Sequence, residues 1–121
     1  MGRMSREKGK RGERELAKIL RQYGYACRRG VQYAGGPDSP DVTGLPGIHI
    51  ECKRTERFSL YDALAQAKKE TGKKELPAVF HRKNESPWVV VMDLDDWLML
   101  YREWEAGKSL VGVVVDDLSK L

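Results

Sequence analysis

The order of secondary structure in this chain depends on one stretch, PDVTGLPGIHIECK, which spans residues 40–53. Leu45-Pro46-Gly47 has the composition of a tight turn, and apolar or β-branched residues flank it on both sides. This pattern predicts two consecutive strands, residues 41–44 and 48–53, joined by the turn. An acid-x-Lys triplet closes the second strand, but composition alone predicts about one or two such triplets by chance. The position of this triplet on the strand is therefore more informative about function than its occurrence.

Charged side chains gather on one face of the second strand. Because side chains alternate along a strand, one face carries His49, Glu51 and Lys53, and the other carries Ile48, Ile50 and Cys52. The apolar set suits a core, but a carboxylate and a lysine on a central strand need partners, since burying unpaired charge is costly. A structural Glu51–Lys53 ion pair and a metal site are both consistent with this pattern. His49 could approach such a site, although a partly buried, hydrogen-bonded histidine is the better expectation.

Apolar spacing and turn residues predict the remaining elements. We expect helices over residues 6–23, 59–71 and 95–105, strands over 25–31, 76–82 and 88–93, and a loop over 32–39. Gly24, Gly72 and Gly107 are the expected helix stops, and Ser59 with Asp62 is an expected N-terminal cap. The apolar tail at 110–115 has no clear assignment. This order predicts an α/β fold with a central mixed β-sheet of about five strands flanked by helices.

Composition indicates a single globular domain over residues 1–121, with residues 1–7 as a candidate flexible basic arm. The chain is 40% hydrophobic and 33% charged, and it contains no apolar run near the roughly 20 residues that span a bilayer. It also lacks an apolar signal core, so we expect an intracellular, cytoplasmic protein with no membrane partner. The two cysteines, Cys27 and Cys52, form neither a disulfide framework nor a zinc motif.

Positive charge is concentrated at the N-terminal end. Residues 1–35 carry ten Lys/Arg and three Asp/Glu, a net +7, whereas the remainder carries 12 and 15, a net −3. Such a segment suits a polyanion, because phosphate contacts supply most sequence-independent affinity for nucleic acids. A solvated charged terminus is the alternative interpretation.

Helical phase separates the two glutamates of the first helix. Glu13 falls within the apolar arc formed by Leu16, Ile19, Leu20 and Tyr23, whereas Glu15 falls outside it. We therefore expect Glu13 to point toward the core, where a carboxylate needs a partner, and Glu15 to lie at the surface. The basic residues Arg14, Lys18 and Arg21 lie on the opposite, solvent-facing side.

Several motifs occur together in a characteristic order. They are Lys8-Gly9, Glu13-Arg14, a helix ending at Tyr23-Gly24-Tyr25, a Gly-containing loop, Pro40-Asp41 and Glu51-Cys52-Lys53. Over residues 8–54 this series resembles the archaeal-type Holliday-junction resolvases of the PD-(D/E)xK nuclease superfamily. The resemblance implies a restriction-endonuclease-like fold and a homodimer that resolves four-way (branched) DNA junctions by paired phosphodiester hydrolysis. It also implies dependence on Mg²⁺, with Mn²⁺ able to substitute.

The resemblance further implies roles for individual residues. Asp41 and Glu51 would ligate the metal with the Cys52 backbone carbonyl, Glu13 would complete the cluster directly or through water, and Lys53 would orient the attacking water. The implied DNA contacts are Arg3, Arg6, Lys8, Lys10, Arg11, Arg14, Arg28 and Arg29. One departure is that Ala34-Gly35-Gly36 stands where such resolvases often carry a hydroxyl residue, with Tyr33 before it and Ser39 after it, so we do not assign that role to a residue. Gln66 is either an exposed helix residue or the glutamine that some nuclease branches use.

Two other functions remain open from the sequence. One is a nuclease of the same superfamily that acts on duplex ends, nicks or flaps. The other is a DNA-binding module without catalysis, in which Glu13, Asp41, Glu51 and Lys53 form a structural ion-pair cluster. The second is disfavoured because four converging charges cost stability without a metal. Trp88, Trp97 and Trp104 lie in apolar contexts that favour packing in the core or at a subunit interface.

Overall fold

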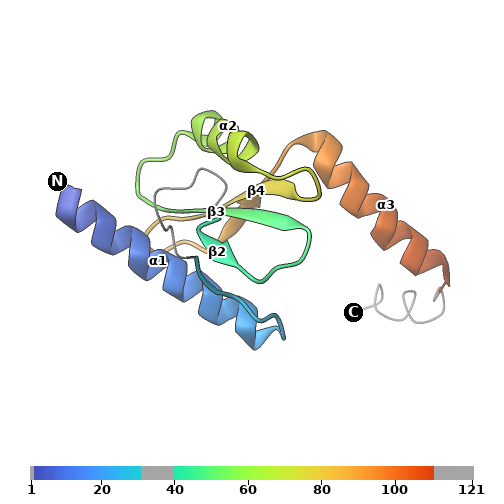
Figure 1. Ribbon diagram of the computed structural model, residues 1–121, viewed down its shortest axis with the longest axis horizontal. Coiled ribbons are helices and arrows are strands. Elements are labelled where there is room, and N and C mark those ends of the chain that lie inside the picture. Colours follow the sequence, from blue (N-terminus) through green and yellow to red (C-terminus); the bar gives the residue numbers. More distant parts are fainter. Residues whose placement is uncertain (1, 31–39, 111–121) are drawn as a thin grey trace.

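A central sheet with a helix on each face forms the body of the protein (Figure 1). The computed structural model describes residues 2–30 and 40–110, so the loop expected at 32–39 and the tail beyond residue 110 lie outside the described residues. The elements are α1 (Gly2–Gln22), β1 (Arg28–Arg29), β2 (Val42–Thr43), β3 (Ile48–Arg54), α2 (Leu60–Glu70), β4 (Leu76–Arg82), β5 (Val89–Val91) and α3 (Leu94–Leu110). None of the helices in these ranges is long and apolar enough to cross a membrane.

The sheet is mixed, with β3 at its centre. Its five strands lie in the order β1-β2-β3-β4-β5. β3 and β4 are parallel, and the other neighbours are antiparallel. The crossover through α2 explains the parallel pair, because parallel strands cannot be joined by a tight turn. The predicted α/β fold with a mixed sheet of about five strands is confirmed.

The two faces of the sheet have separate apolar cores. On one face, Leu16 and Ala17 of α1 pack with Ile50 and Cys52 of β3. On the other, α2 packs against Val79 of β4 through a small apolar set, which consists of Ala63, Leu64 and Ala67. Since side chains of β3 alternate between these faces, Glu51 and Lys53 are directed to the α2 side of the sheet.

Helix α1 begins earlier than its sequence pattern predicts. The expected start was residue 6, but the helix runs from Gly2, so the backbone of residues 2–7 is helical. Its C-terminal end follows the prediction. Gly24 has a positive φ of 97°, its N–H bonds to the Arg21 carbonyl, and the Tyr25 N–H bonds to the Leu20 carbonyl. This is a Schellman ending, in which glycine takes the left-handed position.

Three other boundaries differ from expectation. Of the expected range 25–31, whose last residue lies outside the described part, β1 covers Arg28–Arg29. It begins later than expected because the backbone around Tyr25 bonds back to α1 instead of pairing in the sheet. β5 is also shorter than its expected range. Helix α3 continues through Gly107 to Leu110, since Gly107 is not among the described glycines with positive φ.

Ser59 is the N-cap of α2, but its hydroxyl bonds the Asp62 carboxylate at 2.7 Å rather than a helix N–H.

Gly12 allows α1 to approach the central strand closely. A Cβ atom at Gly12 would lie 2.5 Å from the Cβ atom of Arg54 in β3, well inside any real contact. The Arg54 Cβ is fixed by the β3 backbone and cannot rotate away. Gly9 lies one turn earlier in α1, and a Cβ atom there would meet nothing within 4 Å.

We therefore expect opposite effects from the same substitution at these two glycines. Gly12→Ala should lower the free energy of unfolding by about 1–3 kcal/mol, because α1 must move away from β3. Gly9→Ala should raise it by about 0.5–1 kcal/mol through helix propensity alone. Urea denaturation followed by circular dichroism measures both. Equal effects of the two substitutions would contradict the close approach at Gly12.

Candidate active site

The backbone of Asp41 is held between two strands. Gly30, which follows β1, donates its N–H to the Asp41 carbonyl at 2.8 Å, and the Asp41 N–H bonds to the Ile50 carbonyl of β3 at 2.9 Å. A Cβ atom at Gly30 would lie 2.1 Å from the Pro40 carbonyl oxygen, so only glycine fits beside this segment. These contacts place the Asp41 side chain at the edge of β3.

The side chains of Asp41, Glu51 and Lys53 converge at this edge. The Cys52 N–H donates to Asp41 Oδ2 at 2.8 Å, which fixes the carboxylate one residue away from Glu51. Glu51 is 2% exposed, and Lys53 Nζ lies 3.4 Å from Glu51 Oε1. Lys53 also donates to Gln66 Oε1 of α2 at 3.3 Å, so the exposed Gln66 contributes to the site's border.

Burial changes the acidity of both carboxyl groups. The pKa of Glu51 rises from an ordinary value of 4.5 to about 7, through desolvation first and the neighbouring Asp41 charge second. Desolvation also raises the pKa of Asp41, against the lowering effects of the Cys52 N–H and Lys53. Within the described residues, Glu51 Oε2 is buried without a hydrogen-bond partner. Two adjacent carboxylates with one unpartnered buried oxygen fit a divalent cation, whose charge would offset these costs.

Glu13 lies beside this cluster, with a different direct partner. Its side chain is 18% exposed, and Arg29 Nε donates to Glu13 Oε1 at 2.8 Å. Desolvation raises its pKa, the Arg29 hydrogen bond opposes this, and the Asp41 charge adds to the rise. Glu13 is therefore close enough to Asp41 for an electrostatic effect, while its direct contact is the ion pair with Arg29.

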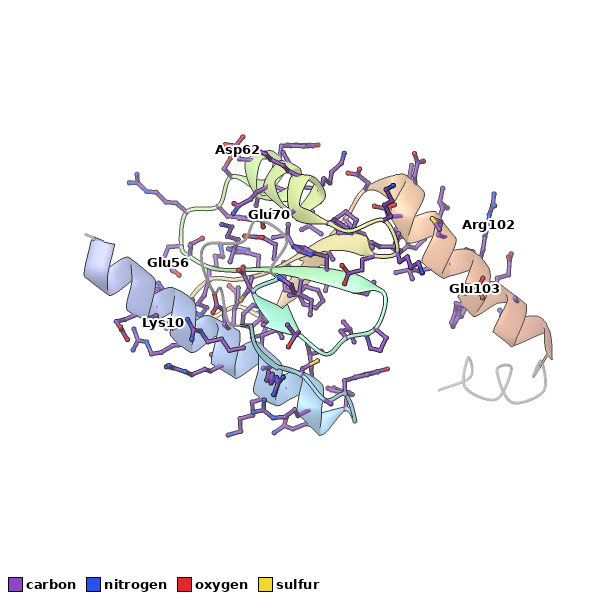
Figure 2. The ribbon with its side chains drawn as sticks, viewed as in Figure 1. Lys10, Glu56, Asp62, Glu70, Arg102 and Glu103 are labelled. Carbon is purple, nitrogen blue, oxygen red and sulfur yellow. The ribbon has the colours of Figure 1, made fainter. Side chains whose placement is uncertain are left out.

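Two further residues approach Glu51 from the α2 side. His49, Glu51 and Glu70 each offer a ligand atom, and the three atoms lie within 4.8 Å of one another. In Figure 2, Glu70 lies between α2 and the sheet, whereas Asp62 at the other end of the helix points away. Sequence reasoning did not select Glu70. Its spacing from the buried Ala63 and Ala67 places it on the inward face of α2, and that phase could have identified it.

The expectation of a hydrogen-bonded His49 is wrong. The side chain is 0% exposed, and neither ring nitrogen has a hydrogen-bond partner within residues 2–30 and 40–110. The other histidine, His81, has the contacts expected of a structural histidine. Its Nε2 lies 2.9 Å from the Thr55 carbonyl, and its ring stacks on Phe58 at 4.0 Å.

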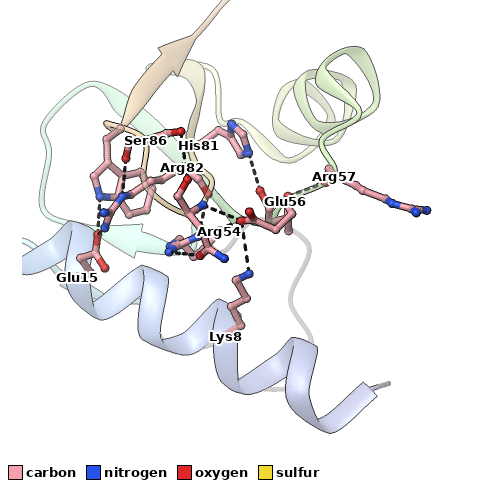
Figure 3. A network of polar contacts seen from close by, with 11 residues as sticks. Lys8, Glu15, Arg54, Glu56, Arg57, His81, Arg82 and Ser86 are labelled. Atoms are coloured by element: carbon pink, nitrogen blue, oxygen red, sulfur yellow. Dashed lines mark hydrogen bonds and ion pairs between the residues drawn. The ribbon is translucent and has the colours of Figure 1, made fainter.

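Glu15 is partly exposed, as expected from its place outside the apolar arc, and it also belongs to a separate polar network (Figure 3). The half-buried carboxylate accepts hydrogen bonds from Arg82 and, at 2.8 Å, from Trp88 Nε1. Lys8 of α1 pairs with Glu56 at 3.7 Å in the same network. These contacts tie α1 to the ends of β3 and β4, and they give Glu15 a structural role.

The predicted DNA-contacting residues differ in their surroundings. Arg11, Arg14 and Arg28 are exposed. Three others form ion pairs, Lys8 with Glu56, Lys10 with Glu7 and Arg29 with Glu13. The side chains of Arg3 and Arg6 lie outside the described part of the structure.

The raised pKa of Glu51 predicts how stability depends on pH in the metal-free protein. The pKa of Glu51 in the folded state is about 7 instead of 4.5, so the folded state binds the Glu51 proton more tightly than the unfolded state does. The contribution of this bound proton to the free energy of unfolding is full below pH 4.5 and is lost as pH rises through 7. At pH 8 with chelator, Glu51→Gln should therefore be more stable than wild type by about 2–3 kcal/mol. Urea titrations across this pH range measure the effect.

Glu15→Gln is the matched control, and it should have the opposite sign. Burial acts to raise the pKa of Glu15, but hydrogen bonds from Trp88 and Arg82 outweigh it and the pKa is lowered. At pH values above the ordinary pKa of glutamate, the ionised Glu15 side chain therefore stabilises the fold. Glu15→Gln should accordingly be less stable than wild type at pH 8. Stabilisation by Glu15→Gln, or none by Glu51→Gln, would contradict the assigned environments.

Comparison with known proteins identifies the family and the fold of the chain. Residues 4–113 match the model of a family described as "Phage putative PDDEXK endonuclease", while no curated protein matches the chain. Among solved structures, the chain is similar to Hjc of Archaeoglobus fulgidus, described as a Holliday junction resolvase from an archaeal hyperthermophile. The identity is 27% and the TM-score 0.54, over 70% of this chain and 72% of that one. The chain therefore belongs to the phage PDDEXK endonuclease family, and it is a nuclease with the restriction-endonuclease-like fold of Hjc.

Proposed function

We propose that this nuclease is a Mg²⁺-dependent endonuclease that resolves four-way DNA junctions by paired phosphodiester hydrolysis. The observation that carries the proposal is the convergence of Asp41, Glu51 and Lys53 at one edge of β3. The similarity to a structure described as a Holliday junction resolvase supports the choice of branched DNA as substrate.

The metal would be held by oxygen atoms from two strands. Asp41 and Glu51 supply carboxylates, and Mg²⁺ prefers such hard ligands together with several waters, with Mn²⁺ able to replace it. The N–H and C=O of a strand residue point to the same side, so the Cys52 carbonyl faces the same strand edge as the N–H that bonds Asp41. Burial and the nearby Asp41 and Glu13 charges raise the pKa of the Cys52 thiol, which stays protonated. A bound cation supplies positive charge to the phosphate and to the leaving oxygen.

Lys53 and Glu13 would complete the chemistry. Glu51 and Gln66 hold the Lys53 ammonium from two sides, at 3.4 and 3.3 Å, which leaves donor capacity for a water molecule or a phosphate oxygen. In this role Lys53 orients the water that attacks phosphorus. Glu13 adds a third carboxylate near Asp41, and it would act on the metal directly or through water.

DNA phosphates would lie along α1 and β1. The exposed Arg11, Arg14 and Arg28 suit this role directly. Lys8, Lys10 and Arg29 now pair with carboxylates. Arg3 and Arg6 continue the same basic segment on the first turns of α1. The pairs Lys8–Glu56 and Lys10–Glu7 are largely exposed and contribute about 0–1 kcal/mol each, so exchanging their carboxylates for a phosphate costs little.

We assign dimerisation to α3. This helix extends away from the sheet and its two flanking helices (Figure 1). Large apolar side chains are exposed along it, namely Leu94, Trp97, Leu98, Met99, Leu100, Tyr101 and Trp104. An apolar helix surface of this kind is normally buried, and a second copy of the chain would cover it. A two-fold dimer also suits paired nicks, because its two active sites can meet two symmetric strands.

The cleavage prediction concerns the two metal-binding carboxylates. Asp41→Asn and Glu51→Gln should each lower junction cleavage in Mg²⁺ by at least about a hundredfold, because each removes a charged ligand, while junction binding persists. Glu103→Gln, at an exposed carboxylate of α3 (Figure 2), is the control and should cleave like wild type. The assay compares a labelled four-way junction with linear duplex of the same sequence.

Each outcome of that assay selects one function. Paired nicks confined to the junction support the proposal. Cleavage of both substrates indicates a nuclease for other DNA forms, and cleavage of neither indicates a DNA-binding module. Full activity of either ligand variant would contradict the assigned metal ligands.

A charge introduced on α3 should prevent dimerisation. Trp97 is 47% exposed, and Trp97→Glu should shift the protein from dimer to monomer in sedimentation velocity experiments. Tyr61→Glu makes the same kind of change at an 82% exposed position of α2 and should leave the dimer intact. A wild-type protein that sediments as a monomer at all concentrations would refute the α3 dimer.

A further inference from the structure

We propose that His49, Glu51 and Glu70 form a second divalent-cation site, which prefers Mn²⁺ or a similar transition metal to Mg²⁺. This inference deepens the proposed nuclease function and rests on it through the shared residue Glu51. Glu51 would then lie between two cations, one on its Asp41 side and one between β3 and α2.

Geometry brings the three side chains together from two elements. His49 and Glu51 are two residues apart on β3, so they share the face that α2 covers. Glu70 is the last residue of α2, and it is half-buried above that face. The three ligand atoms lie within 4.8 Å of one another. Two metal–ligand bonds of about 2.0–2.2 Å span about 4.2 Å, so one cation can reach all three after shifts of a few tenths of an ångström.

The unpartnered atoms at this position are an independent indication of a ligand. His49 is 0% exposed. Both of its ring nitrogens, and Glu51 Oε2, are buried without a hydrogen-bond partner in the described residues. A buried polar atom without a partner costs about 1–3 kcal/mol, and this site concentrates three of them. A cation would bind one ring nitrogen and a Glu51 oxygen, and so remove part of this cost.

The ligand set selects the class of metal. Two carboxylates carry a charge that balances one divalent cation, and the neutral imidazole adds a nitrogen ligand. Imidazole suits Mn²⁺, Fe²⁺, Co²⁺ or Zn²⁺, whereas Mg²⁺ is held mainly by oxygen. The Asp41 side of Glu51 offers oxygen ligands, so the two positions differ in chemistry and can be distinguished by metal.

The test uses the full-length protein without DNA, with Mn²⁺ as the probe. Pulsed electron paramagnetic resonance detects the nitrogen hyperfine coupling that arises when an imidazole nitrogen is bound directly to Mn²⁺. The chain contains two histidines, so the assignment needs two variants. We expect the coupling in wild type, its loss in His49→Gln, and its retention in the control His81→Gln.

Two carboxylate variants complete the experiment. Glu70→Gln should weaken the nitrogen-coupled Mn²⁺ by at least about tenfold in isothermal titration, because it removes one of the two charged ligands. If His49→Gln does not fold, Glu70→Gln still tests the site, because Glu70 is only half-buried and its substitution disturbs the core less. Asp41→Asn should keep the nitrogen coupling, because Asp41 lies on the other side of Glu51.

Several results would overturn the inference. Mn²⁺ that binds wild type without nitrogen coupling would show that His49 is not a ligand, as would no Mn²⁺ binding at all. Coupling that persists in His49→Gln would have the same meaning. Junction cleavage in Mg²⁺ is measured separately, so failure of this site and failure of the proposed nuclease function give different results.

Discussion

The burial of a carboxylate on the central strand is the constraint around which the site is organised. Glu51 is 2% exposed, and its pKa rises to about 7 because desolvation and the Asp41 charge both oppose ionisation. Such a group is tolerated only where counter-charge or hydrogen bonds offset its cost. On β3, Lys53 supplies the counter-charge, and Gln66 of α2 holds its ammonium group. The charges of Asp41 and Glu70 act in the opposite direction and raise the pKa of Glu51 further. The site therefore favours cations at the edge of β3.

Helix α1 separates a structural carboxylate from one near the active site. Glu13 and Glu15 are two residues apart, so helical geometry directs them to different sides. Glu15 is stabilised in its ionised form by hydrogen bonds from Arg82 and Trp88, and its pKa is lowered despite burial. Glu13 has Arg29 as its direct partner, but desolvation outweighs that contact and its pKa is raised. The same helix thus fastens itself to β4 and places an acid beside Asp41.

Helix α3 differs from the rest of the chain in the contacts that stabilise it. Most of the stability of a helix in a protein comes from tertiary packing, but the exposed aromatic residues Trp97, Tyr101 and Trp104 of α3 stack on one another. The sheet and its two flanking helices are packed without it. In the proposed dimer, a second copy of the chain would cover those apolar side chains and so stabilise this helix.

The sequence by itself determined the α/β order, the mixed sheet and the pairing of Glu51 with Lys53 on one strand face, because turn residues and strand alternation are local properties. Helical phase correctly separated Glu13 from Glu15, but it could not predict that Arg82 and Trp88 would reach Glu15. Only the tertiary structure decided which distant groups meet. It placed Arg29 on Glu13, brought Glu70 to Glu51 and, among the described residues, left the buried His49 ring without a hydrogen-bond partner. These outcomes depend on how β3, β4 and the helices pack, and spacing along the chain does not encode distances between elements.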